Sequence, residues 1–357
     1  MMNEESGRRL NFFEAAVMYV GIVMGAAFAS GRESWQFFGV FGDKAWYGLI
    51  IEIVGFTAIA MMMSYISMSR NTTDIGEITL PFESPALSKA LGYILAVVYY
   101  TTVPLLVAAG GSFINQETGV GVMPGSLLIA FLALVTVLGD FQRVSGILKK
   151  IVPLLFAAVV ICAVLVICSD NIKQSGPTSG FKPSKIASNW VLAALIFVSY
   201  NSQSMTPMAA AASLNAKNRR HALAGAAFGG IMLGGLTLLL LIALRKDMAF
   251  TDRTDLPMLA YAKIISPVIH VIFGAALFAA IYSSASSLYY GFTTIIPEGR
   301  NKKYIVIAGM ILALIFSRTG FRSLIAYLLP VQGYYGFVIL TLITIRFIRE
   351  VIRNRSR

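Results

Sequence analysis

Length, composition and charge place this chain in lipid. Its 357 residues are 57% hydrophobic and only 13% charged, whereas roughly a quarter of the residues in an average soluble domain are charged. The net charge of +12 would suit nucleic acid, but the basic residues lie in short loops between apolar runs, which is typical of membrane orientation. We therefore exclude nucleic-acid binding and a soluble domain, and expect an integral membrane protein whose main non-covalent partner is lipid.

Apolar runs of about 20 residues, the length that spans a bilayer as a helix, recur along the chain. They predict an all-α membrane protein of ten transmembrane helices in one integral membrane domain. Residues 1–170 would hold the first five helices and residues 171–357 the second five. The predicted segments are 11–42, 44–69, 86–116, 124–141, 149–169, 187–213, 219–245, 262–296, 303–317 and 321–347.

The loops between these segments predict the orientation. With the N-terminus in the cytoplasm, the inner loops and ends carry 18 of the 29 Lys and Arg residues, the outer loops carry 10, and Arg32 lies in the first segment. Because basic residues gather on the cytoplasmic side, we expect both termini to be cytoplasmic, in a bacterial cytoplasmic membrane. Lipid-facing surfaces and oligomer interfaces have the same composition, so the sequence predicts no oligomeric state.

The first segment contains an interrupted helix. Gly21, Gly25 and Gly31, with small neighbours, break the run GIVMGAAFASGRESWQFFGVFG. A backbone freed there must find partners other than lipid, as it would in a binding site. The alternative is that Gly21 and Gly25, four residues apart, form a close helix-packing motif.

The sixth segment contains a second predicted interruption. Its run FVSYNSQSMTPMAAAAS places hydrogen-bonding side chains at mid-membrane depth, and Pro207 disfavours helix at Thr206. Polar groups at that depth are costly unless they line a cavity or pair with one another. The polar side chains are those of Ser199, Asn201, Ser202, Gln203 and Ser204.

The two interruptions fall at corresponding places. Divided as five plus five, the chain has one in the first helix of each half, and the odd number gives the halves opposite topology. Paired broken helices in an inverted repeat indicate the midplane site of a transporter. Half-helix N-termini there attract an anionic group, and freed carbonyls bind a cation.

This layout resembles the leucine-transporter fold of the amino acid, polyamine and organocation transporter superfamily, and in particular the YkvI-type proteins, regarded as amino-acid permeases. Gly21-x-x-x-Gly25 followed by AAFASGRE is similar to the unwound first helix of that fold, whose backbone binds the substrate carboxylate and sodium; the matching residues run from Gly21 to Ala26. FAAIYSSASS in the eighth segment is similar to the stretch that completes the sodium site. The chain departs from the sodium symporters after the break, where Gly31-Arg32-Glu33-Ser34 replaces their Trp-Arg-Phe-Pro run.

The resemblance implies sodium as a coupling ion and no other cofactor. The implied sodium ligands are Gly21, Met24, Ala279, Tyr282, Ser283 and Ser284. Hydroxyl and carbonyl oxygens suit a small hard cation, although intramembrane serines also bond to the carbonyls of their own helix. Proton-coupled members of the superfamily place a Lys in the middle of span five, whereas IVPLLFAAVVICAVLVIC has no ionisable group. We therefore favour sodium.

The substrate is predicted to be a small polar or zwitterionic molecule. Tyr99 and Tyr100 match the place of a substrate-lining aromatic in the fold, although tyrosines are also common at membrane interfaces. The predicted substrate-binding residues are Gly25, Ala26, Ala27, Phe28, Tyr99, Tyr100, Phe197, Ser199, Tyr200, Asn201, Ser202 and Gln203.

Ionisable groups within or beside the first two segments are further candidates, because charges at that depth are usually functional. Arg32 and Glu33 follow the break on its external side and suggest an external gate, but adjacent helical residues cannot pair with each other. Glu52 resembles a second-helix glutamate that braces the unwound segments; alternatively it faces water near the helix end.

Taken together, these features predict a secondary active transporter, a sodium-coupled symporter of an amino acid or related zwitterion working by alternating access. Rival functions are a proton-coupled or facilitated carrier and a transporter-like metabolite receptor. We expect no enzyme, because the sequence shows no His/Asp metal cluster and no nucleophile with a base at plausible spacing.

Overall fold

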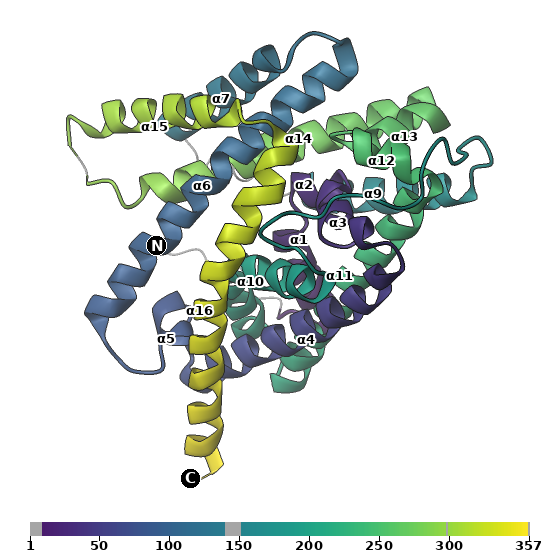
Figure 1. Cartoon of the computed structure of the whole chain (residues 1–357). Helices are drawn as coiled ribbons and strands as arrows, with labels where there is room; N and C mark the ends of the chain where they lie inside the picture. Colours follow the sequence, from purple (N-terminus) through teal and green to yellow (C-terminus); the bar gives the residue numbers. More distant parts are fainter. Residues whose placement is uncertain (1–8, 140–150, 298, 356–357) are drawn as a thin grey trace.

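The computed structural model describes residues 9–139, 151–297 and 299–355, and these are almost entirely helical (Figure 1). A parallel backbone bridge also joins Leu10 to Ala216. The helices are α1 (Phe12–Val23), α2 (Ala26–Ala29), α3 (Arg32–Phe37), α4 (Ala45–Arg70), α5 (Ile75–Thr79), α6 (Pro85–Thr118), α7 (Val122–Leu138), α9 (Ile151–Cys168), α10 (Trp190–Leu214), α11 (Arg219–Leu244), α12 (Met248–Arg253), α13 (Pro257–Ile265), α14 (Pro267–Thr293), α15 (Lys302–Ser317) and α16 (Phe321–Arg355), with 3-10 turns at Gly39–Lys44 and Arg245–Asp247.

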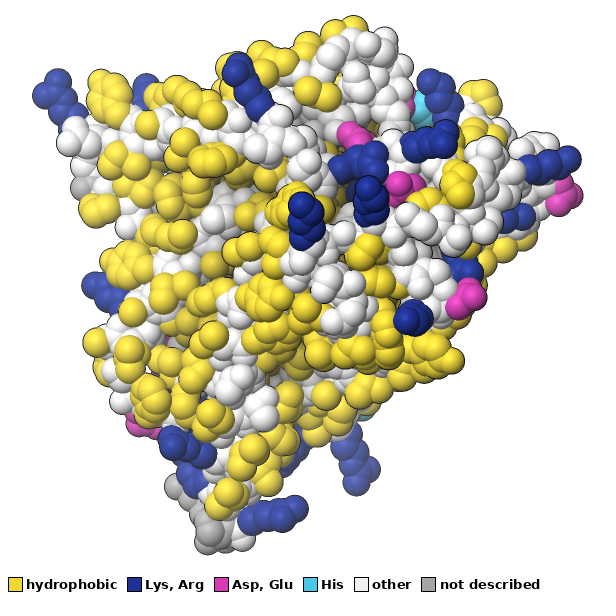
Figure 2. All heavy atoms as spheres, viewed as in Figure 1, with side chains coloured by type: hydrophobic (Ala, Val, Ile, Leu, Met, Phe, Trp, Pro, Cys, Tyr) yellow, Lys and Arg dark blue, Asp and Glu magenta, His cyan; other side chains and the backbone are white. Residues whose placement is uncertain are grey.

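By length and composition, five helical segments within the described residues are long and apolar enough to cross a membrane: Gly39–Arg70, Pro85–Thr118, Arg219–Arg253, Pro267–Thr293 and Phe321–Arg355. Shorter apolar helices cover Phe12–Gly21, Val122–Leu138 and Pro153–Cys168. On the face drawn in Figure 2, hydrophobic side chains cover much of the middle, and most Lys and Arg side chains gather toward the ends. This distribution fits a protein whose middle is surrounded by lipid.

The helices pack as two sets. One set contains α1, α4, α10 and α11, and the other contains α6, α7, α14 and α15. Helix α9 contacts α11 from the first set and α14 from the second, and α16 contacts α4 and α10 from the first and α6 from the second. The short segment α2, which follows the first break, also packs against α6 and α14. The residues after that break therefore lie where the two sets meet.

Glycines allow the first set to pack closely. On α11, Gly225 faces the backbone of α1, Gly230 faces Thr57 and Gly234 faces Ile53 on α4. A Cβ at position 234 would lie 2.1 Å from Ile53 Cγ1, whereas at neighbouring Gly235 it would meet nothing within 4 Å. Helices in lipid associate mainly by such close packing, since lipid tails provide no hydrophobic drive for association.

The predicted interruption of the first helix is confirmed, with one correction. Helix α1 ends at Val23, and Met24 and Gly25 are non-helical. A second break follows at Gly31, whose φ of 80° is left-handed and favours glycine. Gly21, in contrast, lies inside α1. It does not interrupt the helix, because a single glycine without a positive φ only lowers helix propensity.

The predicted interruption of the sixth segment is wrong. Helix α10 is continuous from Trp190 to Leu214, with Pro207 inside it. Polar side chains in this helix bond to its own carbonyls: Ser202 to Val198 at 2.6 Å and Thr206 to Ser202 at 3.2 Å. Serine and threonine side chains in membrane helices commonly bond to carbonyls of the preceding turn in this way. Of the two predicted interruptions, the structure therefore contains only the one in the first segment.

Two other segments differ from expectation. The predicted segment 262–296 is divided at Ser266 into α13 and α14, because Ser266 is extended and caps α14, which has Pro267 at its first position. Between the predicted segments 219–245 and 262–296, the chain forms helix α12 and most of α13. The ends of the fourth and fifth predicted segments, at 140–141 and 149–150, lie outside the described residues.

Candidate substrate site

The first break releases backbone groups beside open space. The amide of Gly25 donates to Val23 O at 2.7 Å instead of to Gly21 O, four residues back. The carbonyl of Gly21 therefore lacks its usual helical donor. Gly25 is partly exposed, and a Cβ built on it would meet no atom within 4 Å. Ala26, Ala27 and Phe28, the next predicted site residues, are buried in α2.

The predicted polar residues of α10 face different neighbours. Ser199 donates to Gly333 O of α16 at 2.7 Å, and Gln203 Nε2 donates to Gln332 O at 3.0 Å. Asn201 donates to Phe197 O in its own helix at 3.0 Å, as Ser202 does to Val198. The polar run therefore does not form one shared cluster, although Ser199 and Gln203 both fasten α10 to α16.

The side chain of Gln332 extends this contact to a third helix. It donates to the hydroxyls of Thr101 and Thr102 on α6 at 2.8 and 2.9 Å. Gln203 Oε1 is buried and has no hydrogen-bond partner. Sequence reasoning missed Gln332, Thr101 and Thr102, and a glutamine near mid-helix in the apolar run of α16 was the available signal.

A buried carboxyl links the segment after the break to α10. The hydroxyl of Tyr200 donates to Glu33 Oε2 at 2.7 Å, and both residues are buried. The rings of Phe37 and Phe197 lie 5.6 Å from the ring of Tyr200, measured between centroids. The structure thus brings predicted gating residue Glu33 and predicted substrate residues Phe197 and Tyr200 together, inside the first helix set.

Glu52 lies fully buried between α4 and α11. The hydroxyl of Thr237 donates to its Oε1 at 2.6 Å, while its Oε2 has no hydrogen-bond partner. The alternative in which Glu52 faces water near a helix end is therefore wrong. A bracing function fits a carboxyl held between two helices, but its contact is with α11 and not with the unwound part of the first helix.

Of the predicted sodium-binding side chains on α14, only that of Tyr282 makes a hydrogen bond within the described residues. Tyr282 shares a 2.6 Å hydrogen bond with Thr136 of α7. Within the described chain, the half-buried hydroxyls of Ser283 and Ser284 make no hydrogen bond, and the buried hydroxyl of Ser286 has none either. The alternative, in which these serines bond to the carbonyls of their own helix, is therefore wrong for Ser283, Ser284 and Ser286. Ala279 is half-buried one turn before Ser283.

The two tyrosines of α6 lie against the second helix set. The hydroxyl of Tyr100 donates to Gly309 O of α15 at 2.8 Å, and its ring packs 4.6 Å from that of Phe292. Tyr99 lies beside Gly291, where a Cβ would be 3.5 Å from its ring. Within the described chain, no side-chain hydrogen bond joins either residue to Asn201 or the break.

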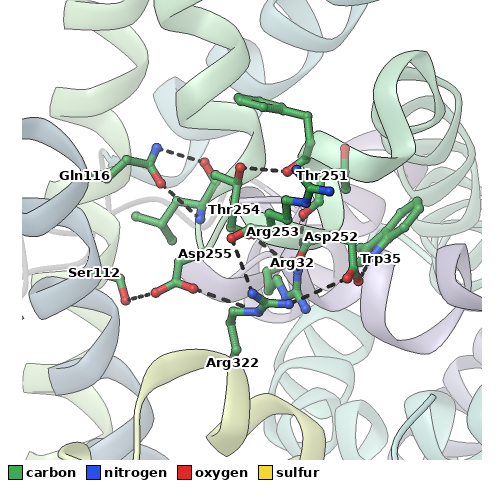
Figure 3. A network of polar contacts seen from close by, with 12 residues as sticks. Arg32, Trp35, Ser112, Gln116, Thr251, Asp252, Arg253, Thr254, Asp255 and Arg322 are labelled. Atoms are coloured by element: carbon green, nitrogen blue, oxygen red, sulfur yellow. Dashed lines mark hydrogen bonds and ion pairs between the residues drawn. The ribbon is translucent and has the colours of Figure 1, made fainter. Parts of the chain in front are cut away.

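Arg32 points away from Glu33, as expected for adjacent helical residues. Its guanidinium Nη1 donates to the carbonyls of Thr251, Asp252 and Thr254 at 3.2, 3.0 and 3.4 Å (Figure 3). These carbonyls end α12, where a cation compensates the helix dipole. The prediction that Arg32 needs a partner other than Glu33 is confirmed.

The same network of hydrogen bonds and ion pairs connects the ends of several helices (Figure 3). Trp35 of α3 donates to Asp252 Oδ1 at 2.9 Å, and Ser112 of α6 donates to Asp255 Oδ2 at 2.6 Å. Arg322, at the start of α16, lies 3.8 Å from Asp252 and 4.0 Å from Asp255. Segments α3, α6, α12 and α16 therefore meet at the end of the molecule opposite the C-terminus (Figure 1).

Comparison of the sequence with known proteins identifies two relatives and no family. A comparison with models of known protein families finds no match. The membrane protein YkvI of Bacillus subtilis is 24% identical over 96% of this chain and 97% of its own length, and YyaD of the same organism is 22% identical over 91% and 93%; neither is characterised. The description of YkvI as a membrane protein supports the membrane location that the apolar helices indicate.

Solved transporters share the fold. The inward-facing structure of Mhp1 has a TM-score of 0.63, with 13% identity over 97% of this chain and 79% of its own. A manganese transporter of Eremococcus coleocola has a TM-score of 0.53, with 11% identity over 99% and 88%. These neighbours are transporters and not enzymes, in agreement with the prediction. The chain is an integral membrane protein, a relative of YkvI, with the leucine-transporter fold.

Proposed function

We propose that this protein is a secondary active transporter that couples sodium entry to uptake of an amino acid or related small zwitterion. The observation that carries the proposal is the break at Met24 and Gly25, which frees backbone groups beside α2. Segment α2 packs against α6 and α14 of the second set, and its Phe28 ring lies 6.3 Å from that of Phe197 on α10 of the first set. Backbone polar groups at membrane depth are tolerated where they line a cavity or bind a ligand.

The two helix sets supply a route to alternating access. Movement of α1, α4, α10 and α11 against α6, α7, α14 and α15 would open the break first to one side and then to the other. The fold shared with Mhp1, solved in an inward-facing conformation, supports this proposal. In this scheme the chain has ten spans, which form two inverted repeats over residues 1–170 and 171–357. Five are the longer helical segments, and the other five are α1 to α3 taken together, α7, α9, α10 and α15.

Sodium is favoured by the oxygen atoms that remain available. The carbonyl of Gly21 lacks its helical donor, and the hydroxyls of Ser283 and Ser284 make no hydrogen bond within the described residues. Neutral oxygens of this kind bind a small hard cation without a buried charge. Manganese, the metal named for one structural neighbour, is not proposed, since the described residues contain no group of three His, Cys, Asp or Glu side chains able to hold a metal.

The test is uptake into proteoliposomes with a panel of labelled amino acids. We expect one zwitterion to accumulate under an inward sodium gradient and not under an inward proton gradient with choline outside. Ser283→Ala should reduce sodium-dependent uptake at least tenfold, whereas Ser287→Ala, on the exposed side of the same helix, should leave it unchanged.

Other outcomes would redirect the proposal. Accumulation driven by pH alone would replace sodium with a proton and turn attention to the buried carboxyls of Glu33 and Glu52. Saturable binding without accumulation or counterflow would favour a metabolite receptor. Failure of every zwitterion to bind or accumulate would remove the amino-acid assignment.

A further inference from the structure

A basic cavity opens at the end of the molecule opposite the C-terminus. It has a volume of about 530 Å³, which is within the usual range for small-molecule sites. Its walls come from the 169–189 connection, α3, the end of α12 and the start of α16. Four cationic side chains line it, those of Arg32, Lys182, Arg253 and Arg322, against one carboxylate, that of Asp252.

The two carboxylates near this cavity, those of Asp252 and Asp255, only partly neutralise its four cations. Asp252 Oδ1 accepts from the indole of Trp35 at 2.9 Å, and Asp255 Oδ2 accepts from Ser112 at 2.6 Å. Both lie 3.8 to 4.0 Å from Arg322, at the outer limit for an ion pair, and the Arg322 side chain is 39% exposed. The short contacts of both carboxylates are thus with neutral donors, and two carboxylates against four cations leave a surplus of positive charge at the cavity.

Two further cations have no partner of their own. The side chains of Lys182 and Arg253 are exposed and make no hydrogen bond or ion pair within the described residues. Arg32, although its Nη1 is engaged, has a buried Nε without a hydrogen-bond partner. A concave surface with a surplus of one charge raises the local concentration of opposite charge and speeds its capture.

We propose that this cavity is an outer binding site for a carboxylate, through which the protein first captures a carboxylate-bearing substrate. Guanidinium groups bind carboxylates in a planar, bidentate manner, and the aromatic ring of Phe181 provides an apolar wall. The site is separate from the break between α1 and α2, and it limits the substrate class to zwitterions or anions. Its assignment to substrate capture rests on the proposed transport function.

Binding is tested first on the purified protein, without transport. Apparent melting temperature is measured against sodium acetate, sodium chloride, sodium phosphate and methylammonium chloride at equal ionic strength. Acetate should raise it most, because a ligand that binds the folded state stabilises it by mass action. The half-saturating acetate concentration should rise about tenfold in the variant Lys182→Gln/Arg253→Gln, which removes two charges with no structural partner.

Lys173→Gln is the matched control, since Lys173 is exposed in the same connection but does not line the cavity. It should leave the acetate response unchanged. The proposal is overturned if chloride or phosphate stabilises as well as acetate, or if the double variant responds to acetate as the control does. The reversal Lys182→Glu provides a second check, because it should weaken acetate binding and strengthen binding of methylammonium.

Transport distinguishes failure of this site from failure of the proposed function. If acetate binds as expected but no amino acid is taken up into proteoliposomes, the carboxylate site stands and the transport proposal fails. If an amino acid is transported but acetate has no effect, the outer site fails alone. If both hold, the double variant should raise the KM for uptake with little change in kcat, and the effect should shrink at high salt.

Discussion

At the scale of single residues, the contact between Tyr200 and Glu33 joins the segment after the break to α10. Removing the hydroxyl in Tyr200→Phe leaves a buried carboxyl without its donor, which costs about 1 to 3 kcal/mol. We expect a lower apparent melting temperature in detergent. Tyr99→Phe is the control, because the Tyr99 hydroxyl makes no hydrogen bond within the described residues.

A double-mutant cycle tests whether the loss comes from this pair. Glu33→Leu in the Tyr200→Phe background removes the stranded carboxyl, so the second substitution should cost less than it does in the unmodified protein. Strictly additive losses would mean that the two side chains stabilise the fold independently and that the 2.7 Å contact contributes nothing.

At the scale of elements, glycines determine how closely α4 and α11 approach. Gly234→Ala places a methyl group 2.1 Å from Ile53, and overpacking of this kind costs about 1 to 3 kcal/mol. Gly235→Ala meets nothing within 4 Å and should be neutral or slightly stabilising, since alanine favours helix. Thermal unfolding of the two variants compares them directly, and equal melting temperatures would contradict the packing argument.

Pro330 inside α16 leaves the carbonyl of Ala326 without a backbone donor, because proline has no N–H. The hydroxyl of Ser184, in the 169–189 connection, donates to that carbonyl. Ser184→Ala should therefore cost about 1 kcal/mol. In a Pro330→Ala background, which restores the N–H, the same substitution should cost measurably less. An identical cost in both backgrounds would exclude this explanation.

The sequence patterns predicted where helices occur better than whether each helix is continuous. Each predicted apolar segment contains a helix, and the break at Gly25 followed from small residues in an apolar run. Pro207 was a misleading signal, because α10 continues through it from Trp190 to Leu214, and its polar side chains bond to carbonyls of the helix or of α16 instead of lining a break. The contacts of Gln332 with α6 and α10 depend on which helices become neighbours, and no local pattern specifies that.

At the scale of the whole molecule, orientation is the open prediction. A cysteine at position 175, in Ser175→Cys with Cys168→Ser to remove the exposed native thiol, should react with a membrane-impermeant maleimide added to intact cells. A cysteine at position 301, in Asn301→Cys, lies in an exposed connection predicted inside and should react only after lysis. The reverse pattern would place both termini outside and move the basic cavity to the cytoplasm.

The bridge between Leu10 and Ala216 has a mechanical consequence. Leu10 N donates to Asn215 O at 2.8 Å and Lys217 N donates to Leu10 O at 2.9 Å, so the chain just before α1 is fastened to the end of α10. A force applied to the N-terminus is thus carried first by these two hydrogen bonds and loads α10 before it stretches α1. Pulling from that end would therefore displace α1 and α10 together.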